Sequence, residues 1–262
     1  MENNNEKPKD IGEYKKWLKK EHRIDISNRT ITHYGSVTNK IKQDMGKSDF
    51  WIQLTENLKE YDSEYLLKTK YRLLIPESKP ELHVKTFDSF LLKTFRKNIL
   101  ENKQFPDEPK GGWILPDNWY CKINDIIRTS LAVKYLDGVE FMIDKINSLC
   151  EQHNMPCEYN LEAKEEGYYA AHVYIKQEFE VPKVTWDTEM INVLIEIQIT
   201  TELQEVIRRL LHKYYEKRRE KEKEMDIKWQ WDYKSDEFAT NYLGHILHYV
   251  EGMIMEIRDK QK

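Results

Sequence analysis

A chain of 262 residues is long enough to bury one large core, and its 39 % hydrophobic and 12 % aromatic content excludes an intrinsically disordered protein, although 34 % of its residues are charged. The formal net charge of −4 gives no overall indication of nucleic-acid binding. No apolar run approaches the roughly 20 residues of a membrane helix, the first ten residues do not resemble a signal peptide, and three cysteines form neither a disulfide framework nor a zinc site, so we expect a cytoplasmic protein without a membrane partner.

The first 70 residues are predicted to be helical. Between residues 11 and 24, apolar side chains recur at helical spacing, and a second amphipathic pattern runs from about residue 48 to 75. The apolar positions are Ile11, Tyr14, Trp17 and Leu18 in the first pattern and Trp51, Leu54 and Leu58 in the second. No linker follows these helices, so we expect them to pack on the rest of the chain.

From about residue 80 the hydrophobic period changes, and about five strands are predicted among further helices. The predicted strands are residues 81–87, 124–136, 157–163, 168–179 and 190–200, and the predicted helices are 88–103, with Asp88 as its N-cap, 137–154, 201–224 and 235–261. Residues 105–119 contain three prolines and two glycines and are predicted to be a loop. Some strands follow one another without a helix, which predicts an α+β fold with a mixed central sheet.

Glu196 is a carboxylate inside a strongly apolar strand pattern, "NVLIEIQIT". Strand alternation places it on the same face as Leu194 and Gln198. A carboxylate there is costly unless it meets water, a cation or a metal ion. From the residues alone two interpretations stay open: an edge strand with one solvated face, or a functional acid.

Asp125 begins the pattern "NDIIRTSL", three residues before Arg128. An Asp at the start of a strand usually serves a turn. Together with a carboxylate on a neighbouring strand it would instead suit Mg²⁺, which takes few protein oxygens and leaves room for phosphates.

Four polar or basic side chains cross a predicted strand-to-helix junction in "HVKTFDSFLLKTFR". They are Lys85, Ser89 and Lys93, at four-residue intervals, and Arg96, which shares a helix face with Lys93. A helix N-terminus with these cations would suit a polyphosphate, whereas an ordinary basic helix is the alternative.

A glycine and small residues surround two tyrosines and a lone histidine in "KEEGYYAAH", residues 164–172. In so bulky a chain this pattern predicts a close approach to the backbone. A strongly basic stretch with interleaved tyrosines follows at residues 212–223, for which a solvated helix with Glu–Lys and Glu–Arg pairs is the simpler interpretation.

These motifs, in this order, resemble the synthetase domain of the RelA/SpoT family over about residues 80–220. The family's R-x-K-x-x-x-S-x-x-x-K stretch is matched by Lys85, Ser89 and Lys93, its strand-borne Asp by Asp125, its K-x-x-G-Y-x-x-x-H loop by Lys164, Gly167, Tyr168 and His172, and its E-[IV]-Q strand by Glu196 and Gln198. The family's hydrolase domain is not matched, because no His-Asp dipeptide occurs.

The resemblance implies a nucleotidyltransferase-like synthetase fold and a pyrophosphokinase that transfers pyrophosphate from ATP to a ribose 3′-hydroxyl. It implies that Glu196 is the general base, and that Asp125 and Glu196 are the ligands of Mg²⁺. ATP would lie against Lys85, Ser89, Lys93 and Arg96, with Arg128 in place of a lost cation. Tyr168 would stack on the acceptor base, Gly167 would allow its approach, and Lys164, His172 and Gln198 would complete the acceptor site.

The chain departs from the family pattern at several basic positions. His83, Ser130 and Thr200 stand where the family has arginine, Arg128 stands where it has glycine, and Tyr169 stands where Arg or Gln is common. The same features are similar to the toxic small synthetases of toxin–antitoxin systems, which implies an antitoxin partner.

Because basic residues of the nucleotide site are missing and a basic helix is present, we expect the acceptor to be the 3′ end of tRNA, contacted by Lys213, Lys217, Arg218 and Lys221. The alternatives are a synthetase that makes guanosine or adenosine alarmones and, in another class, an inactive RNA- or partner-binding protein. The predicted division is a helical extension over residues 1–75, a synthetase domain over 76–225 and a C-terminal helix over 226–262.

Overall fold

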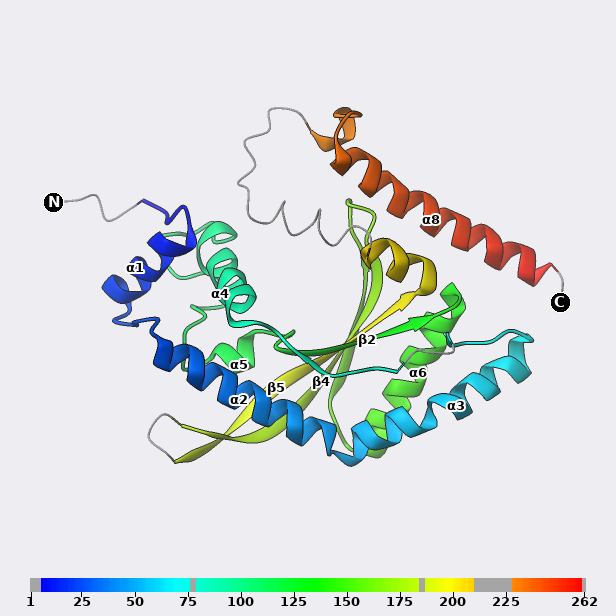
Figure 1. The fold of residues 1–262 in the computed structure, drawn as a ribbon, viewed down its shortest axis with the longest axis horizontal. Coiled ribbons are helices and arrows are strands. Elements are labelled where there is room, and N and C mark those ends of the chain that lie inside the picture. The colour runs from blue at the N-terminus through cyan, green and yellow to red at the C-terminus, as the bar shows by residue number, and fades with distance from the viewer. Residues whose placement is uncertain (1–5, 76–78, 184–186, 210–227, 261–262) are drawn as a thin grey trace. The chain divides into compact units, whose positions relative to one another are not determined.

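The computed structural model describes residues 6–75, 79–183, 187–209 and 228–260. Within these ranges, no helix combines the length and the apolar character that a membrane span needs. Figure 1 follows the helices and strands along the chain, from blue at the N-terminus to red at the C-terminus. The chain divides into two compact units, each assembled from three segments. Unit 1 contains residues 1–48, 82–128 and 176–196, and unit 2 contains residues 49–81, 129–175 and 197–262. The predicted division at residues 75 and 225 is a different partition and stays a prediction.

Unit 1 has an aromatic core formed by its helices. Its helical elements are α1 (Ile11–Glu21), α2 (Asn28–Gly46), α4 (Phe87–Phe95), the π-helical turn η1 (Arg96–Leu100) and the short helix α5 (Trp119–Lys122). Tyr14 and Leu18 of α1 are fully buried and pack with Leu91, Phe95 and Ile99. The predicted N-terminal helix is therefore present, and its apolar stripe faces α4.

Unit 2 contains the longer helices. They are α3 (Asp49–Thr69), α6 (Leu136–Gln152), a helical stretch at residues 202–209, the 3₁₀ turn η2 (Trp229–Trp231) and α8 (Asp236–Asp259). Helix α3 packs on α6 and buries Trp51, Leu54 and Leu58, as the periodicity predicts. Helix α6 also contacts α8. Residues 105–118, between α4 and α5, contain neither helix nor strand, which confirms the predicted loop.

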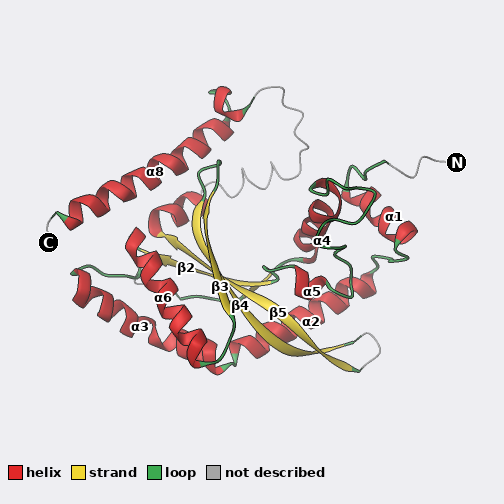
Figure 2. Ribbon diagram, turned by 180° about the vertical axis from the view of Figure 1, so that it is seen from behind, coloured by secondary structure: helices red, strands yellow, loops and turns green. Residues whose placement is uncertain are grey.

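The five strands form one mixed sheet in the order β1-β2-β5-β4-β3 (Figure 2, yellow), which confirms the predicted fold class. Their bounds are β1 His83–Val84, β2 Ile127–Val133, β3 Cys157–Ala163, β4 Tyr169–Pro182 and β5 Thr188–Thr201. Strands β1 and β2 pair antiparallel with His83 opposite Arg128, and β3 and β4 pair antiparallel with Asn160 opposite His172. Because β2, β4 and β5 each pass from one unit to the other, the sheet belongs to both.

Three local predictions are corrected by the structure. The N-cap of α4 is Thr86, whose hydroxyl accepts from the Ser89 amide, and Asp88 lies in the first turn instead. Asp125 lies in a turn two residues before β2 rather than in the strand. Strand β5 occupies the centre of the sheet, so the edge-strand interpretation of Glu196 is wrong.

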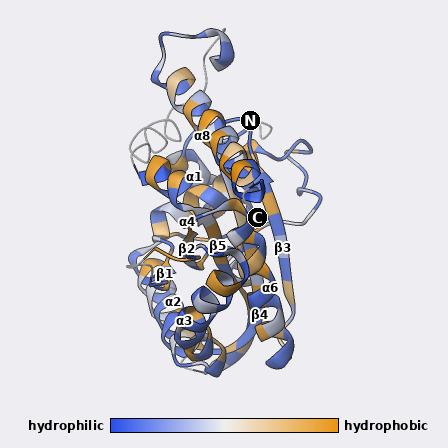
Figure 3. Ribbon diagram, turned by 90° about the vertical axis from the view of Figure 1, so that its right-hand side faces the viewer, coloured by the Kyte–Doolittle hydropathy of each residue, from blue (hydrophilic) through white to orange (hydrophobic). Residues whose placement is uncertain are grey.

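Helix α8 exposes several of its large apolar side chains. Its apolar positions Tyr242, Ile246, Tyr249 and Met253 are exposed, and orange residues lie along the helix in Figure 3. Its buried side is formed by Asn241, Gly244, Glu251 and Arg258. Leu247, Ile254 and Met255 are half-buried, so polar groups, a glycine and partly buried apolar side chains together pack this helix against the rest of unit 2.

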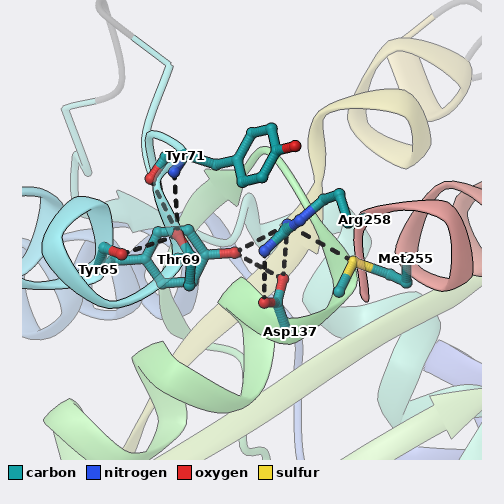
Figure 4. Close-up of polar contacts among 6 residues, drawn as sticks. All are labelled: Tyr65, Thr69, Tyr71, Asp137, Met255 and Arg258. Atoms are coloured by element: carbon teal, nitrogen blue, oxygen red, sulfur yellow. Dashed lines mark hydrogen bonds and ion pairs between the residues drawn. The ribbon is translucent and has the colours of Figure 1, made fainter. Parts of the chain in front are cut away.

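Arg258 anchors the C-terminal end of α8 (Figure 4). Its guanidinium donates to both carboxylate oxygens of Asp137, at 3.2 and 3.0 Å, and to the Tyr65 hydroxyl at 3.2 Å. The same group lies 4.4 Å from the ring centroids of Tyr71 and Tyr135. The Arg258 side chain is only 4 % exposed, so charge, hydrogen bonds and ring contacts all act where water is largely excluded.

We expect Arg258→Ala to release the end of α8 and to lower the free energy of unfolding by about 1.5–3 kcal/mol, the range for hydrogen bonds to charged groups. Denaturant unfolding measures the loss, and hydrogen exchange locates it in α8. The control is Lys260→Ala, which removes an exposed pair with Glu256 worth about 0.3–0.5 kcal/mol. Equal effects of the two substitutions would contradict the anchoring role.

Candidate functional site

A carboxylate held by two lysines forms the centre of the candidate site in unit 1. The Lys85 ammonium lies 2.8 Å from Asp125 Oδ2, and the Lys93 ammonium lies 2.9 Å from Oδ1. The exposed fractions of these side chains are 10 % for Lys85, 13 % for Asp125 and 27 % for Lys93. The structure therefore brings together three residues that the sequence placed 40 and 32 positions apart.

Local backbone geometry explains this convergence. The Lys85 amide donates to the Ile126 carbonyl at 2.8 Å, which extends the pairing of β1 with β2 to the turn that holds Asp125. The Tyr34 hydroxyl donates to the Lys85 carbonyl at 2.9 Å. Thr86 then caps α4, so Lys85 lies just before the helix and Lys93 two turns inside it. Both side chains reach the same carboxylate from one strand-to-helix junction.

The electrostatics of the cluster favour the charged carboxylate. Burial alone would raise the pKa of Asp125, but the charges of Lys93 and Lys85 and their hydrogen bonds lower it to about 2. Burial is the main cause that lowers the pKa of Lys85, and it outweighs the attraction of Asp125. Lys93 and Arg128 lower it further, because both are nearby cations. The cluster is thus a partly desolvated anion within an excess of positive charge.

The other predicted donor-side residues are placed less centrally. Ser89 is exposed, and its hydroxyl accepts from Thr86 at 2.9 Å. Arg96 is half-exposed and pairs with Glu101 at 2.8 Å, away from Asp125. Arg128 lies opposite His83 in the β1–β2 pair, near enough to act on Lys85.

Lys97 is a candidate that the sequence analysis missed. It is half-buried, and its pKa is lowered by burial first and by the charge of Lys93 second, while Asp125 raises it. Its position four residues after Lys93 was the available signal. Lys97 lies in the π-helical turn η1, within electrostatic range of Asp125.

Glu196 lies on β5 with 4 % of its surface exposed, between the buried Ile195 and Ile197. This corrects the expectation of a solvated strand face. A carboxylate so deeply placed in a central strand needs a functional or electrostatic reason.

The predicted acceptor residues all lie in unit 2. The Tyr168 hydroxyl and His172 Nε2 form a hydrogen bond of 3.1 Å, and the Lys164 ammonium lies 5.1 Å from the Tyr168 ring centroid. His172 is buried and lies 3.4 Å from Glu162, which also pairs with Lys164 at 2.8 Å. The loop motif therefore folds into one connected polar group around Tyr168.

Tyr168 also lines a pocket at the start of β4 and the end of β5. The pocket is lined by Ser130, Tyr168, Tyr169, Ala170, Gln198, Thr200, Gln204 and Arg208. Two of the positions at which the family has arginine, Ser130 and Thr200, are therefore part of this wall. Arg208 is the one charged side chain among these lining residues, and it pairs with Glu205 at 2.7 Å.

The carboxylates fit Mg²⁺ only in combination with phosphates. Within the described ranges no group of three or more His, Cys, Asp or Glu side chains is placed to hold one metal ion. Mg²⁺ commonly uses one or two carboxylates plus substrate phosphates and water, which matches hard oxygen donors at Asp125 and Glu196. Both oxygens of Asp125 are held by ammonium groups, so an anion that attracts the lysines would also free this ligand.

The predicted tRNA-contacting residues, Lys213, Lys217, Arg218 and Lys221, lie outside the described residues. They stay predictions.

No protein-family model and no curated protein sequence matches this chain. Solved structures do. A GTP pyrophosphokinase family protein from Streptococcus pneumoniae is similar with a TM-score of 0.54 and 19 % identity, over 85 % of this chain and 91 % of that one. The small alarmone synthetase 1 from Bacillus subtilis, bound to its product pppGpp, is similar with a TM-score of 0.51 and 18 % identity, over 79 % of this chain and 90 % of that one. The chain therefore has the fold of these synthetases.

We expect Asp125→Asn to lower the free energy of unfolding by about 2 kcal/mol near neutral pH, because the pKa of Asp125 is lowered from 3.8 to about 2. The same substitution should reduce the pH dependence of stability at low pH. A lowered folded-state pKa stabilises the fold above the unfolded value of about 3.8 and loses this effect as the pH falls toward 2. Denaturant unfolding at several pH values between 2 and 7 tests this. Asp25→Asn, in an exposed pair with Lys19, is the control. Superimposable curves for Asp125→Asn and the unmodified protein would contradict the assignment.

Proposed function

We propose that this protein is an ATP-dependent pyrophosphokinase that transfers the β,γ-pyrophosphate of ATP to a ribose 3′-hydroxyl. The observation that carries this proposal is the lysine–aspartate cluster of Lys85, Lys93 and Asp125 at the start of α4, in a chain with the fold of pyrophosphate-transferring synthetases.

The donor phosphates are assigned to this cluster for electrostatic reasons. Lys85 and Lys93 are oriented by Asp125, and both are available to a stronger anion. The helix N-terminus capped by Thr86 presents backbone amides beside them. Lys97 and Arg128 add positive charge close by. Positioning and neutralisation of charge are the main sources of catalysis in such phosphoryl transfers.

The transfer itself needs a base and a path for the leaving group. The acceptor 3′-oxygen attacks the β-phosphorus of ATP, the bond from that phosphorus to the bridging α,β-oxygen breaks, and AMP leaves. The proton of the hydroxyl goes to the Glu196 carboxylate as general base. Mg²⁺, when bound at Asp125 and Glu196, neutralises charge on the phosphates.

On the acceptor side, Tyr168 supplies a ring for a stacked base, and Lys164, His172 and Gln198 surround it. We assign the acceptor to the 3′-terminal nucleotide of tRNA because, among the described residues that line the pocket beside Tyr168, Arg208 is the one cation, and it is already paired with Glu205. A terminal RNA nucleotide brings only a phosphodiester charge on its 5′ side, whereas GDP or GTP brings several negative charges.

Modification of the tRNA 3′ end would block aminoacylation and make the protein a toxin, which would require an antitoxin. The second candidate is synthesis of a guanosine or adenosine alarmone, and it is favoured by the bound product pppGpp in the similar Bacillus subtilis structure. A protein that only binds RNA would have no reason to bury Glu196.

Incubation with γ-³²P-ATP and one acceptor at a time separates these candidates. We expect the label on total tRNA and none on tRNA that lacks its terminal adenosine, because the 3′-hydroxyl of that nucleotide is the acceptor. Label on GDP, GTP or an adenine nucleotide in place of tRNA would establish the alarmone candidate. No label on any acceptor would refute the pyrophosphokinase.

Glu196→Gln removes the base and keeps its shape, so we expect a rate loss of about 10²–10⁴-fold at unchanged stability. Rates of label transfer and thermal unfolding measure the two properties. The matched control is Glu189→Gln, which changes an exposed carboxylate on the same strand. Turnover within a few-fold of the unmodified rate would exclude Glu196 as the base.

Tyr168→Ala should raise the acceptor KM by roughly 5–150-fold, equivalent to about 1–3 kcal/mol for one lost base stack, and should leave the ATP KM unchanged. Tyr168→Phe keeps the ring and should be mild. If both variants lose acceptor affinity equally, the hydroxyl bonded to His172 rather than the ring is the important group.

A further inference from the structure

We propose that the C-terminal helix α8 holds the acceptor site in place, and that His245 is the positioning residue that fixes the loop carrying Tyr168. This inference rests on the proposed function for its kinetic consequence, but its structural content, that α8 immobilises residues 164–169, can be tested without any activity.

The loop and the helix meet through their backbones. The loop is a tight turn closed by the Gly167 amide bonded to the Lys164 carbonyl at 2.9 Å, and Gly167 has a φ of +74°. A Cβ on Gly167 would lie 2.3 Å from the Asn241 carbonyl oxygen, and a Cβ on Gly244 would lie 2.3 Å from the Gly167 carbonyl oxygen. Neither position has room for a side chain, so the contact requires glycine on both elements.

His245 bridges the two ends of the loop. Its Nε2 lies 2.8 Å from the carbonyl oxygen of Glu165, and its Nδ1 lies 2.8 Å from the hydroxyl of Tyr169. A carbonyl can only accept, so Nε2 carries a proton and donates to Glu165, while Nδ1 shares a hydrogen bond with the Tyr169 hydroxyl. One imidazole therefore holds the residues that flank the segment of Gly167 and Tyr168.

His248, one turn further along α8, holds the ring of Tyr169. The two rings are stacked with centroids 3.7 Å apart and an interplanar angle of 8°. Burial first, and the charge of His245 second, lower the pKa of His248, which favours its neutral form in this stack. The Tyr169 carbonyl also accepts from the Thr200 hydroxyl at 3.3 Å, so ring, hydroxyl and backbone of Tyr169 are all fixed.

The buried side of α8 is rich in polar groups. Gln204 donates to the Gly244 carbonyl at 3.3 Å, and Asn241 is fully buried with neither atom of its side-chain amide hydrogen-bonded. Several large apolar side chains of the helix, among them Ile246 and Tyr249, are exposed instead. The polar side that packs inward is the one that carries His245 and His248 to the loop.

Because His245 contacts the loop and not the acceptor, its loss should act through Tyr168. We expect His245→Ala to raise the acceptor KM about tenfold, for two lost hydrogen bonds, with the ATP KM unchanged. Tyr169→Phe, which removes one of the two bonds, should give part of this effect, and the double variant should be less than additive. His245→Gln, which keeps an amide donor for the Glu165 carbonyl, should recover part of the loss.

Hydrogen exchange of the protein without substrates provides the independent readout. Amides of residues 164–169 should exchange about tenfold faster in His245→Ala, while the rest of the chain is unaffected. Glu256→Ala, an exposed change on the same helix, is the control and should alter neither property. Unchanged exchange in residues 164–169 would overturn the proposal, as would an equal rise of both KM values with a lower melting temperature.

The two failures are distinguishable. If the unmodified protein labels no acceptor but His245→Ala still accelerates exchange in the loop, the proposed function is wrong and the role of His245 in fixing the loop is retained. If the unmodified protein labels an acceptor and His245→Ala changes neither the acceptor KM nor the exchange rate, the role of His245 is wrong and the proposed function is retained.

Discussion

The donor side of the site depends on one carboxylate. The ammonium groups of Lys85 and Lys93 repel each other, and Asp125, which lies 2.8 and 2.9 Å from them, is the anion that holds them together. The same ion pairs join the turn before β2 to the start of α4, so a group assigned to chemistry also stabilises the local fold. An incoming polyphosphate would replace one anion by another within a prearranged set of cations, which limits the reorganisation that binding requires.

The sheet can be predicted from the sequence, because strand alternation and β-branched runs mark all five strands. The convergence of Lys85, Lys93 and Asp125 can be predicted from the motifs that contain them. Other features depend on tertiary context. Lys97 was missed because its burial and its proximity to Asp125 are tertiary features, and its four-residue spacing from Lys93 alone does not reveal them. The role of α8 was missed because Tyr169 and His245 are 76 residues apart, and a single sequence gives no signal for that pairing.

Helix α8 shows why apolar periodicity alone misplaces a helix. Its apolar residues predict one buried face, yet the structure buries Gly244, Asn241 and Arg258 instead. A glycine allows the helix backbone to reach the Gly167 backbone, and the tyrosine rings and Asp137 surround the buried guanidinium of Arg258. Specific contacts at two points of the helix have outweighed the area that its apolar side would bury.

Gly167 and Gly244 face each other so closely that a side chain at either position would separate the two backbones. Gly167 alone would need to remain glycine for its positive φ, but Gly244 has no such backbone requirement within a helix, where alanine is the better helix former. Among related chains, we therefore expect glycine at the position of Gly244 only where glycine is also present at the position of Gly167. In a relative with a larger residue at the position of Gly244, we expect that the C-terminal helix does not pack on the loop, even where the loop motif is kept. The residue at this position therefore predicts whether the C-terminal helix of a relative contacts the loop.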